Sequence, residues 1–166
     1  MKSLLIKAIL YAMLKTGEKR VLGLDIGKRR IGLAITDECF LTAQPLKVIK
    51  RSSLRDDLAE IIEEVVKNNA GRIVVGMPYE MNGTEGPAAG YTRRFTSALE
   101  AALKAEPATG QVDIEFWDER FSTVAVERVL IEGDARRSKR KQVVDKLAAA
   151  YILQGWLDGR QNREED

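Results

Sequence analysis

The pattern of apolar and polar residues early in the chain predicts three strands. Apolar runs at residues 21–26 and 30–37 are joined by a turn at Gly27 and Lys28, which is typical of an antiparallel pair. Residues 45–51 form a further run that could be a third strand. We therefore expect the folded domain to begin with a three-stranded meander.

Helical periodicity follows, and then a strand of a different kind. Residues 53–69 place apolar side chains on one face and acids on the other, with Ser52 or Ser53 as the cap and Gly71 after the end. Residues 72–78 are a continuous run of largely β-branched residues. Such a run is expected for a strand that is covered on both faces.

The second half of the chain alternates helices with connections. The expected elements are a glycine-rich loop at 79–90, a helix at 91–105, a strand at 112–117, a helix at 123–131, a basic connection at 133–141 and a closing helix at 143–157. A meander followed by helix–strand–helix–strand predicts an α/β sandwich with a mixed five-stranded sheet flanked by helices.

The chain divides into one domain and two short ends. Residues 20–160 would form the domain, and 161–166 a polar tail. Residues 1–19 would be a short amphipathic helix, with a disordered leader or a membrane-surface anchor as alternatives. Lys7 interrupts the apolar stretch of this extension, which is too short to span a bilayer. We therefore expect a cytoplasmic protein without a membrane segment.

The amino-acid composition excludes several kinds of catalytic and metal site. The 166 residues are 31% charged and 45% hydrophobic, as in ordinary soluble proteins, and the net charge is only +2. Any affinity for nucleic acid must therefore come from local clusters of charge. The single cysteine, Cys39, excludes an intramolecular disulfide, and the absence of histidine excludes His-based zinc sites and Ser-His catalysis. Carboxylates remain, and their oxygens suit hard cations such as Mg²⁺ or Mn²⁺.

Acids stand beside apolar residues at three positions, of which Asp25 is the first. It ends a strand face that it shares with Val21 and Gly23. An ionised carboxylate away from water is costly unless it is paired or holds a metal. The alternative is an aspartate that simply starts a turn.

The other two positions lie at the end of the last strand and on the closing helix. Asp118 and Glu119 follow the strand, where ligands gather in open α/β sheets, although a polar strand end before a helix cap is the alternative. Asp145 lies on the apolar stripe of the helix together with Ala148 and Ala149. A buried ion pair is the alternative there.

These three positions predict a metal site if they converge. In a sheet of strand order 3-2-1-4-5, the first strand, the last strand and the last helix can meet at one edge. Clustered carboxylates repel one another unless a cation compensates. Two divalent ions roughly 4 Å apart are the usual arrangement where phosphodiesters are cut, one activating water and the other stabilising the leaving oxygen.

Two basic clusters flank the acids in the sequence. Charge runs are usually solvated faces, but a groove for a phosphate backbone would require cations on both sides of such a site. We predict substrate binding by Lys28, Arg30, Arg120, Arg136, Arg137, Lys139, Arg140 and Lys141.

Four segments of the chain resemble, in order and spacing, the motifs of the YqgF/RuvX family. They are LDIGKRRIGLAIT, VVGMPYEMNGTEGPA, FWDERFST and DKLAAAYILQGWL, and the resemblance covers about Arg20 to Leu157. The resemblance implies a ribonuclease-H-like fold related to the RuvC Holliday-junction resolvases. It also implies a Gly-x-Pro loop at Gly76 to Pro78.

The resemblance implies a cytoplasmic, metal-dependent endonuclease that matures the 5′ end of precursor 16S ribosomal RNA. Resolution of Holliday junctions in branched DNA is the family's other implied activity. Asp25, Glu119 and Asp145 would be the catalytic metal ligands, with Asp118 in support, because Glu119 aligns better than Asp118 with the acid of the resolvases. The partners would be nucleic acid and the ribosome or its precursor. The chain would be a monomer or a homodimer.

Two other classes of function remain open at this point. LDIGKRRIGLAI also resembles the first phosphate loop of the actin and sugar-kinase phosphotransferases, but these need a second domain to enclose ATP. The basic clusters fit equally well a non-catalytic factor that binds RNA during ribosome assembly. Cleavage with manganese, or binding without cleavage, would distinguish the nuclease from the binding factor.

Overall fold

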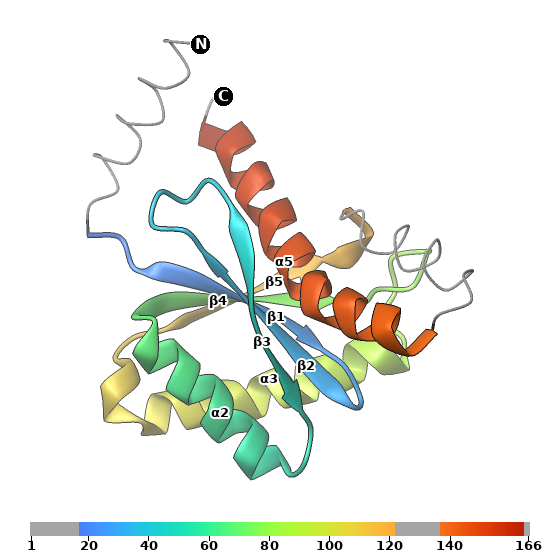
Figure 1. Ribbon diagram of the computed structural model, residues 1–166, viewed down its shortest axis with the longest axis horizontal. Helices are drawn as coiled ribbons and strands as arrows, with labels where there is room; N and C mark the ends of the chain where they lie inside the picture. The colour runs from blue at the N-terminus through green and yellow to red at the C-terminus, as the bar shows by residue number, and fades with distance from the viewer. Residues whose placement is uncertain (1–16, 122–136, 165–166) are drawn as a thin grey trace.

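A mixed five-stranded sheet forms the centre of the molecule (Figure 1). The computed structural model describes the backbone of residues 17–121 and 137–164 and the side chains of 17–120 and 147–163. The strands are β1 (Arg20–Ile26), β2 (Arg30–Thr36), β3 (Ala43–Lys50), β4 (Ala70–Met77) and β5 (Asp113–Asp118), in the order β3-β2-β1-β4-β5. The expected strand order is confirmed, and the bounds of the strands differ from the expected ones by one or two residues.

The direction of the strands changes across the sheet. β1 pairs with β2 and β2 with β3 in antiparallel fashion, whereas β4 is parallel to both β1 and β5. The carboxyl ends of β1, β4 and β5 therefore lie at the same edge of the sheet. This edge carries two of the three positions at which the sequence places acids beside apolar residues.

Helices cover both faces of the sheet (Figure 1). On one face lie α2 (Leu54–Lys67) and α3 (Pro87–Ala105), and on the other the long α5 (Arg137–Glu164). Two short 3₁₀ turns, η1 (Pro107–Thr109) and η2 (Glu119–Phe121), flank β5. Within the described part of the chain, no helix combines the length and the apolar character that a membrane span needs.

Two apolar cores result, one on each side of the sheet. Side chains such as Leu24 and Ile73 pack with Leu99 beneath α2 and α3. On the other side, Val74 and Trp156 belong to the core beneath α5. Successive residues of a strand alternate between these cores because side chains of a strand point to opposite faces.

The observed starts of α2 and α3 show which residues determine where a helix begins. Ser53 caps α2 as expected, and its hydroxyl oxygen accepts a hydrogen bond from the Asp56 backbone N–H at 3.1 Å. The expected loop at 79–90 is too long, because α3 already begins at Pro87. Proline suits the first position of a helix, where its missing N–H has no intrahelical partner.

The closing helix is longer than the pattern indicated. It begins at Arg137 rather than at residue 143 and runs to Glu164 rather than ending at residue 157. The expected basic connection is therefore helical from Arg137 onward, since lysine and arginine are good helix formers. The expected helix at 123–131 and residues 1–16 of the extension lie outside the described residues.

Candidate functional site

The candidate site lies where β1, β4 and β5 end. Leu24 pairs with Val75 between β1 and β4, and Gly76 pairs with Trp117 between β4 and β5. Asp25 is the residue after Leu24, as Gly76 is the residue after Val75. The register therefore aligns Asp25 with Gly76 and Trp117 across three neighbouring strands.

The face on which Asp25 lies follows from its neighbour Gly23. A Cβ atom at Gly23 would lie 2.8 Å from the Leu153 Cβ and 3.0 Å from the Ala149 carbonyl oxygen, so this position faces α5 at close range. Residues two apart in a strand share a face. Asp25, which is half-buried, is thus on the α5 side of the sheet.

Glu119 reaches the same side of the sheet over Gly76. A Cβ at Gly76 would lie 2.6 Å from the Glu119 Oε1 and 2.5 Å from the Ile152 Cδ1. Only glycine leaves room there for both the carboxylate and the helix. The structure therefore brings Glu119 to the edge and face that carry Asp25, although the two are far apart in the sequence.

Helix α5 carries Asp145 toward this edge. Ile152 lies over Gly76, whereas Trp156 lies 5.8 Å from the guanidinium carbon of Arg72, nearer the start of β4. The helix therefore runs antiparallel to β4. Asp145 is two turns before Ile152, so its backbone lies toward the carboxyl ends of the strands. Its side chain is outside the described residues.

Asp118 differs from its neighbour Glu119 in direction. Phe116 packs against the core beneath α2 and α3, and Trp117 against the core beneath α5. Strand alternation therefore directs Asp118 to the side of Phe116, away from Asp25. This geometry favours Glu119 over Asp118 as the residue that faces Asp25.

Arg120 holds Asp118 in place. Its Nε and Nη2 donate hydrogen bonds to the Asp118 carboxylate at 3.0 and 2.6 Å, and its backbone N–H donates to Asp118 Oδ1 at 2.9 Å. These hydrogen bonds from Arg120 keep the pKa of Asp118 below its ordinary value. The carboxylate is therefore held ionised by a partner in its own turn, and this turn carries Glu119 between the two residues.

Arg120 also reaches the loop after β4. Its Nη1 donates to the Met81 carbonyl oxygen at 3.5 Å, and its guanidinium carbon lies 5.7 Å from the centre of the Tyr79 ring. Gly83 comes close as well, because a Cβ there would lie 3.3 Å from the Arg120 Nη1. One arginine thus connects the end of β5 with the loop that follows Gly76. The expectation that Arg120 binds substrate did not include this bracing role.

The structure describes the side chains of only some of the basic residues that are expected to bind substrate. Lys28 is exposed and Arg30 half-buried in the β1–β2 hairpin. Arg136 lies outside the described residues. The backbone of Arg137, Lys139, Arg140 and Lys141 forms the first turns of α5, and their side chains lie outside the described residues.

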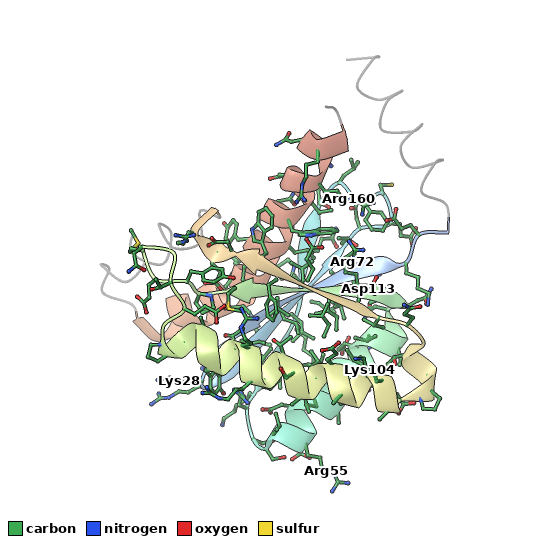
Figure 2. The ribbon with its side chains drawn as sticks, turned by 180° about the vertical axis from the view of Figure 1, so that it is seen from behind. Lys28, Arg55, Arg72, Lys104, Asp113 and Arg160 are labelled. Atoms are coloured by element: carbon green, nitrogen blue, oxygen red, sulfur yellow. The ribbon has the colours of Figure 1, made fainter. Side chains whose placement is uncertain are left out.

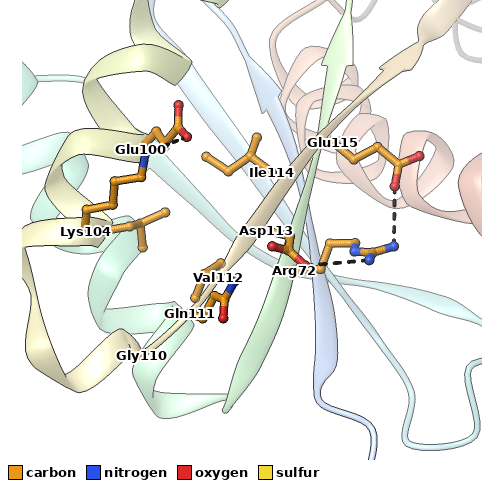
Figure 3. Close-up of a pocket in the computed structure, with 10 residues that line it drawn as sticks. Arg72, Glu100, Lys104, Gly110, Gln111, Val112, Asp113, Ile114 and Glu115 are labelled. Carbon is orange, nitrogen blue, oxygen red and sulfur yellow. Dashed lines mark hydrogen bonds and ion pairs between the residues drawn. The ribbon is translucent and has the colours of Figure 1, made fainter.

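A pocket of about 680 Å³ lies away from the acids, at the start of β5 (Figure 3). Arg72 sits beside it, 3.5 Å from a Glu115 oxygen and 3.8 Å from an Asp113 oxygen. The pocket is lined by no residue that the sequence singles out as a site residue.

The comparison with protein families decides the identity of the domain. The model of the RuvX family, described as Holliday junction resolvase, matches residues 19–159. The chain belongs to the RuvX family. Its fold is ribonuclease-H-like, as the sequence predicted.

Relatives in the RuvX family match nearly the whole chain. A Symbiobacterium thermophilum protein is 51% identical over 87% of this chain and 95% of its own length. A Clostridium tetani protein is 46% identical over 87% of this chain and 99% of its own. Both carry the name "putative pre-16S rRNA nuclease".

Solved structures of similar fold come from Thermus thermophilus RuvC. One is RuvC in complex with a Holliday junction substrate, with a TM-score of 0.56 and 19% identity over 87% of this chain and 97% of that chain. Another RuvC structure has a TM-score of 0.52 and 18% identity, with the same coverage. At this identity the likeness shows the shared fold of the RuvX domain and RuvC.

The residues of this RuvX-family chain fit a divalent cation. Among the described side chains no three of the usual ligand types form a cluster, and the Asp145 side chain is not among them. Asp25 and Glu119 nevertheless lie on one face and offer the oxygen ligands that Mg²⁺ and Mn²⁺ prefer. The missing Cβ of Gly76 leaves the space that Glu119 occupies. The two described carboxylates are therefore suitable ligands for a divalent cation.

Proposed function

We propose that this protein is a metal-dependent endonuclease that matures the 5′ end of precursor 16S ribosomal RNA in the cytoplasm. The names of relatives that are 41–51% identical support this substrate. The observation that carries the proposal is the position of the Glu119 carboxylate over Gly76, on the face of the sheet that Asp25 shares. Two acids so placed are suited to holding a cation beside a phosphodiester.

In this proposal Asp25, Glu119 and Asp145 hold one or two Mg²⁺ or Mn²⁺ ions. A bound divalent ion supplies Lewis acidity toward water and toward a phosphoryl oxygen. Asp25 and Glu119 are both half-buried, and this partial removal from water strengthens the attraction between the carboxylates and a cation. Asp118 supports the site indirectly through its hydrogen bonds with Arg120.

The basic residues have separate tasks. Lys28 and Arg30, directly after Asp25 in the hairpin, bind phosphates of the substrate and offset charge that develops at the reacting phosphate. Arg120 braces the turn of Glu119 and the loop after Gly76, while its guanidinium remains near enough to this edge to offset charge as well. The basic start of α5 would bind the substrate on the other side of the acids.

Replacement of Asp25 by asparagine tests the proposal. Asp25→Asn should abolish cleavage of a 5′-extended precursor 16S rRNA fragment with Mn²⁺, and its thermal stability should equal or exceed that of the wild type, because repulsion between carboxylates is relieved. The matched control is Asp113→Asn, which removes an exposed acid at the opposite end of the sheet. Full activity of purified Asp25→Asn would refute the assignment of Asp25.

A second candidate activity is resolution of Holliday junctions, because the matching family is described in those terms. A symmetric resolvase needs two sites, and hence a dimer of this chain. The same incubation with a four-way DNA junction as substrate separates the two activities. If neither substrate is cut but RNA is bound, the protein is a binding factor and not a nuclease.

A further inference from the structure

The tip of the β1–β2 hairpin lies beside the end of β3. Arg30 of β2 pairs with Lys50 of β3 in the antiparallel register, and the Arg51 backbone N–H donates to the Arg29 carbonyl oxygen at 3.0 Å. Cations that are about twenty residues apart in the sequence are therefore neighbours. The pairing gathers them at one corner of the sheet.

Arg51 fastens this corner to the start of α2. Its Nη1 donates to the Gly27 carbonyl oxygen at 3.2 Å, and its Nε donates to Asp57 Oδ2 at 2.8 Å. Asp57 is in the first turn of α2 and is almost fully buried. Arg55 is two residues before Asp57 in the same turn, and its side chain is exposed at the start of α2.

The exposed cations of this corner lack acidic partners. Lys28, Arg29, Lys50 and Arg55 are all exposed, and none of them forms an ion pair with any residue that the structure describes. We call these four residues the basic corner.

The acids closest in the chain are already engaged. Asp57 is held by Arg51, and Asp56 accepts a hydrogen bond from the Ser52 hydroxyl at 3.4 Å. Several cations elsewhere on the surface are paired, as Lys104 is with Glu100 at 3.0 Å. Cations that outnumber the acids around them repel one another, so a polyanionic partner would be bound favourably here.

We propose that the basic corner binds phosphates of the nucleic-acid strand that flanks the cleavage site. The inference rests on the proposed function, since Asp25 is only three residues before Lys28 on the strand that leads into the hairpin. The substrate backbone would run from the acids over the hairpin tip to Lys50 and Arg55. Figure 2 shows Lys28 at the lower left and Arg55 at the bottom of the molecule, both extending outward, with Arg160 in the upper part.

The test compares two double variants of equal charge. Lys50→Gln/Arg55→Gln removes two cations of the basic corner, neither of which is assigned to the acid site. Lys67→Gln/Lys104→Gln removes two cations from the last turns of α2 and α3, at the far ends of these helices. The readout is the salt dependence of binding to a 5′-extended precursor 16S rRNA fragment, and separately to a four-way DNA junction, in EDTA so that no cleavage occurs.

Each phosphate contact that is lost lowers the slope of log K against log salt by roughly one. We expect the corner variant to lower the slope by about two on the preferred probe. The control variant should match the wild type, and thermal melts of both variants should match the wild type as a check of folding. Equal slopes for the corner variant and the wild type, or binding to neither probe, would overturn the inference.

The outcomes separate this inference from the proposed function. If the wild type binds but never cleaves with Mn²⁺, and the corner variant still lowers the slope, the nuclease proposal fails and the basic corner stands. If the wild type cleaves and the slopes are equal, the nuclease stands and the basic corner fails.

Discussion

Gly76 determines how closely Glu119 can approach the sheet. Its missing side chain leaves space that the Glu119 carboxylate and Ile152 share. Any larger residue would have to displace the Glu119 carboxylate, the end of the Ile152 side chain or both. The need for glycine here comes from close packing rather than from an unusual backbone angle, because Gly76 is not among the described residues with positive φ.

Gly76→Ala should therefore impair cleavage more than folding. The added methyl group would stand 2.6 Å from Glu119 Oε1 and must move it. Overpacking of this kind costs about 1–3 kcal/mol of unfolding free energy. Parallel measurements of cleavage with Mn²⁺ and of urea unfolding should show near-complete loss of activity in a protein that remains folded.

The matched control is Gly90→Ala in α3. A Cβ there meets only Arg94 Nη1, at an ordinary 3.5 Å. Alanine favours a helix over glycine by about 0.5–1 kcal/mol, so this variant should be slightly more stable and fully active. A Gly76→Ala protein that cleaves as fast as Gly90→Ala would show that the position of Glu119 does not matter.

The individual acids could be predicted from the sequence only in part. Asp25 is recognisable because a carboxylate ends an otherwise apolar strand. The preference for Glu119 over Asp118 came from family resemblance, and the alternation of Phe116 and Trp117 supports it independently. That Asp118 is bound by Arg120 could not be predicted, because the contact depends on side-chain directions in a short 3₁₀ turn. The metal-ligand roles remain predictions.

At the scale of elements, Arg51 fastens three pieces of secondary structure together. It contacts the hairpin at Gly27, α2 at Asp57 and α3 at Tyr91, whose hydroxyl forms a hydrogen bond with Arg51 Nη1. Its guanidinium carbon also lies 4.9 Å from the centre of the Phe95 ring. The side chain of Arg51 is 14% exposed and that of Asp57 2% exposed, so this ion pair is largely removed from water.

Arg51→Ala should be strongly destabilising. It would leave the buried Asp57 carboxylate without its cation, and loss of one partner of a buried pair costs about 3–5 kcal/mol. Chemical denaturation measures this directly. Lys104→Ala, which breaks an exposed ion pair, is the control and should change stability by less than about 1 kcal/mol. A similarly small loss of stability in both variants would show that the Arg51 contacts do not stabilise the fold.

Element bounds were predictable where a local signal exists. Ser53 predicts the start of α2, because its side chain accepts a hydrogen bond from a backbone N–H of the first turn. Pro87 falls within the loop that the sequence predicts, whereas its fixed φ suits the first turn of α3. The Arg51 contacts join residues up to forty positions apart, and no periodic pattern encodes such a contact.

At the scale of the whole molecule, two cores share one sheet. The strand order could be predicted because the meander and the helix connections restrict how five strands can be arranged. Each interior strand contributes side chains to both cores, so loss of either core exposes apolar side chains of the same strands. We therefore expect the described domain to unfold as one cooperative unit.

The two tryptophans allow a test of this cooperativity. Trp117 and Trp156 both pack in the core beneath α5, so their fluorescence reports on that side. Far-UV circular dichroism reports on all the helices and strands. The two signals should give the same midpoint in urea. An earlier fluorescence transition would show that α5 detaches before the rest of the domain unfolds.

The position of α5 after all five strands has a consequence during synthesis. The ribosome makes β1 to β5 before this helix, so Val21, Ala34 and Val74 lack the cover of α5 until that helix has emerged. A nascent chain that is released early, before α5, would present a bare apolar surface. Such fragments should be captured by chaperones or degraded, and only full-length chains would accumulate.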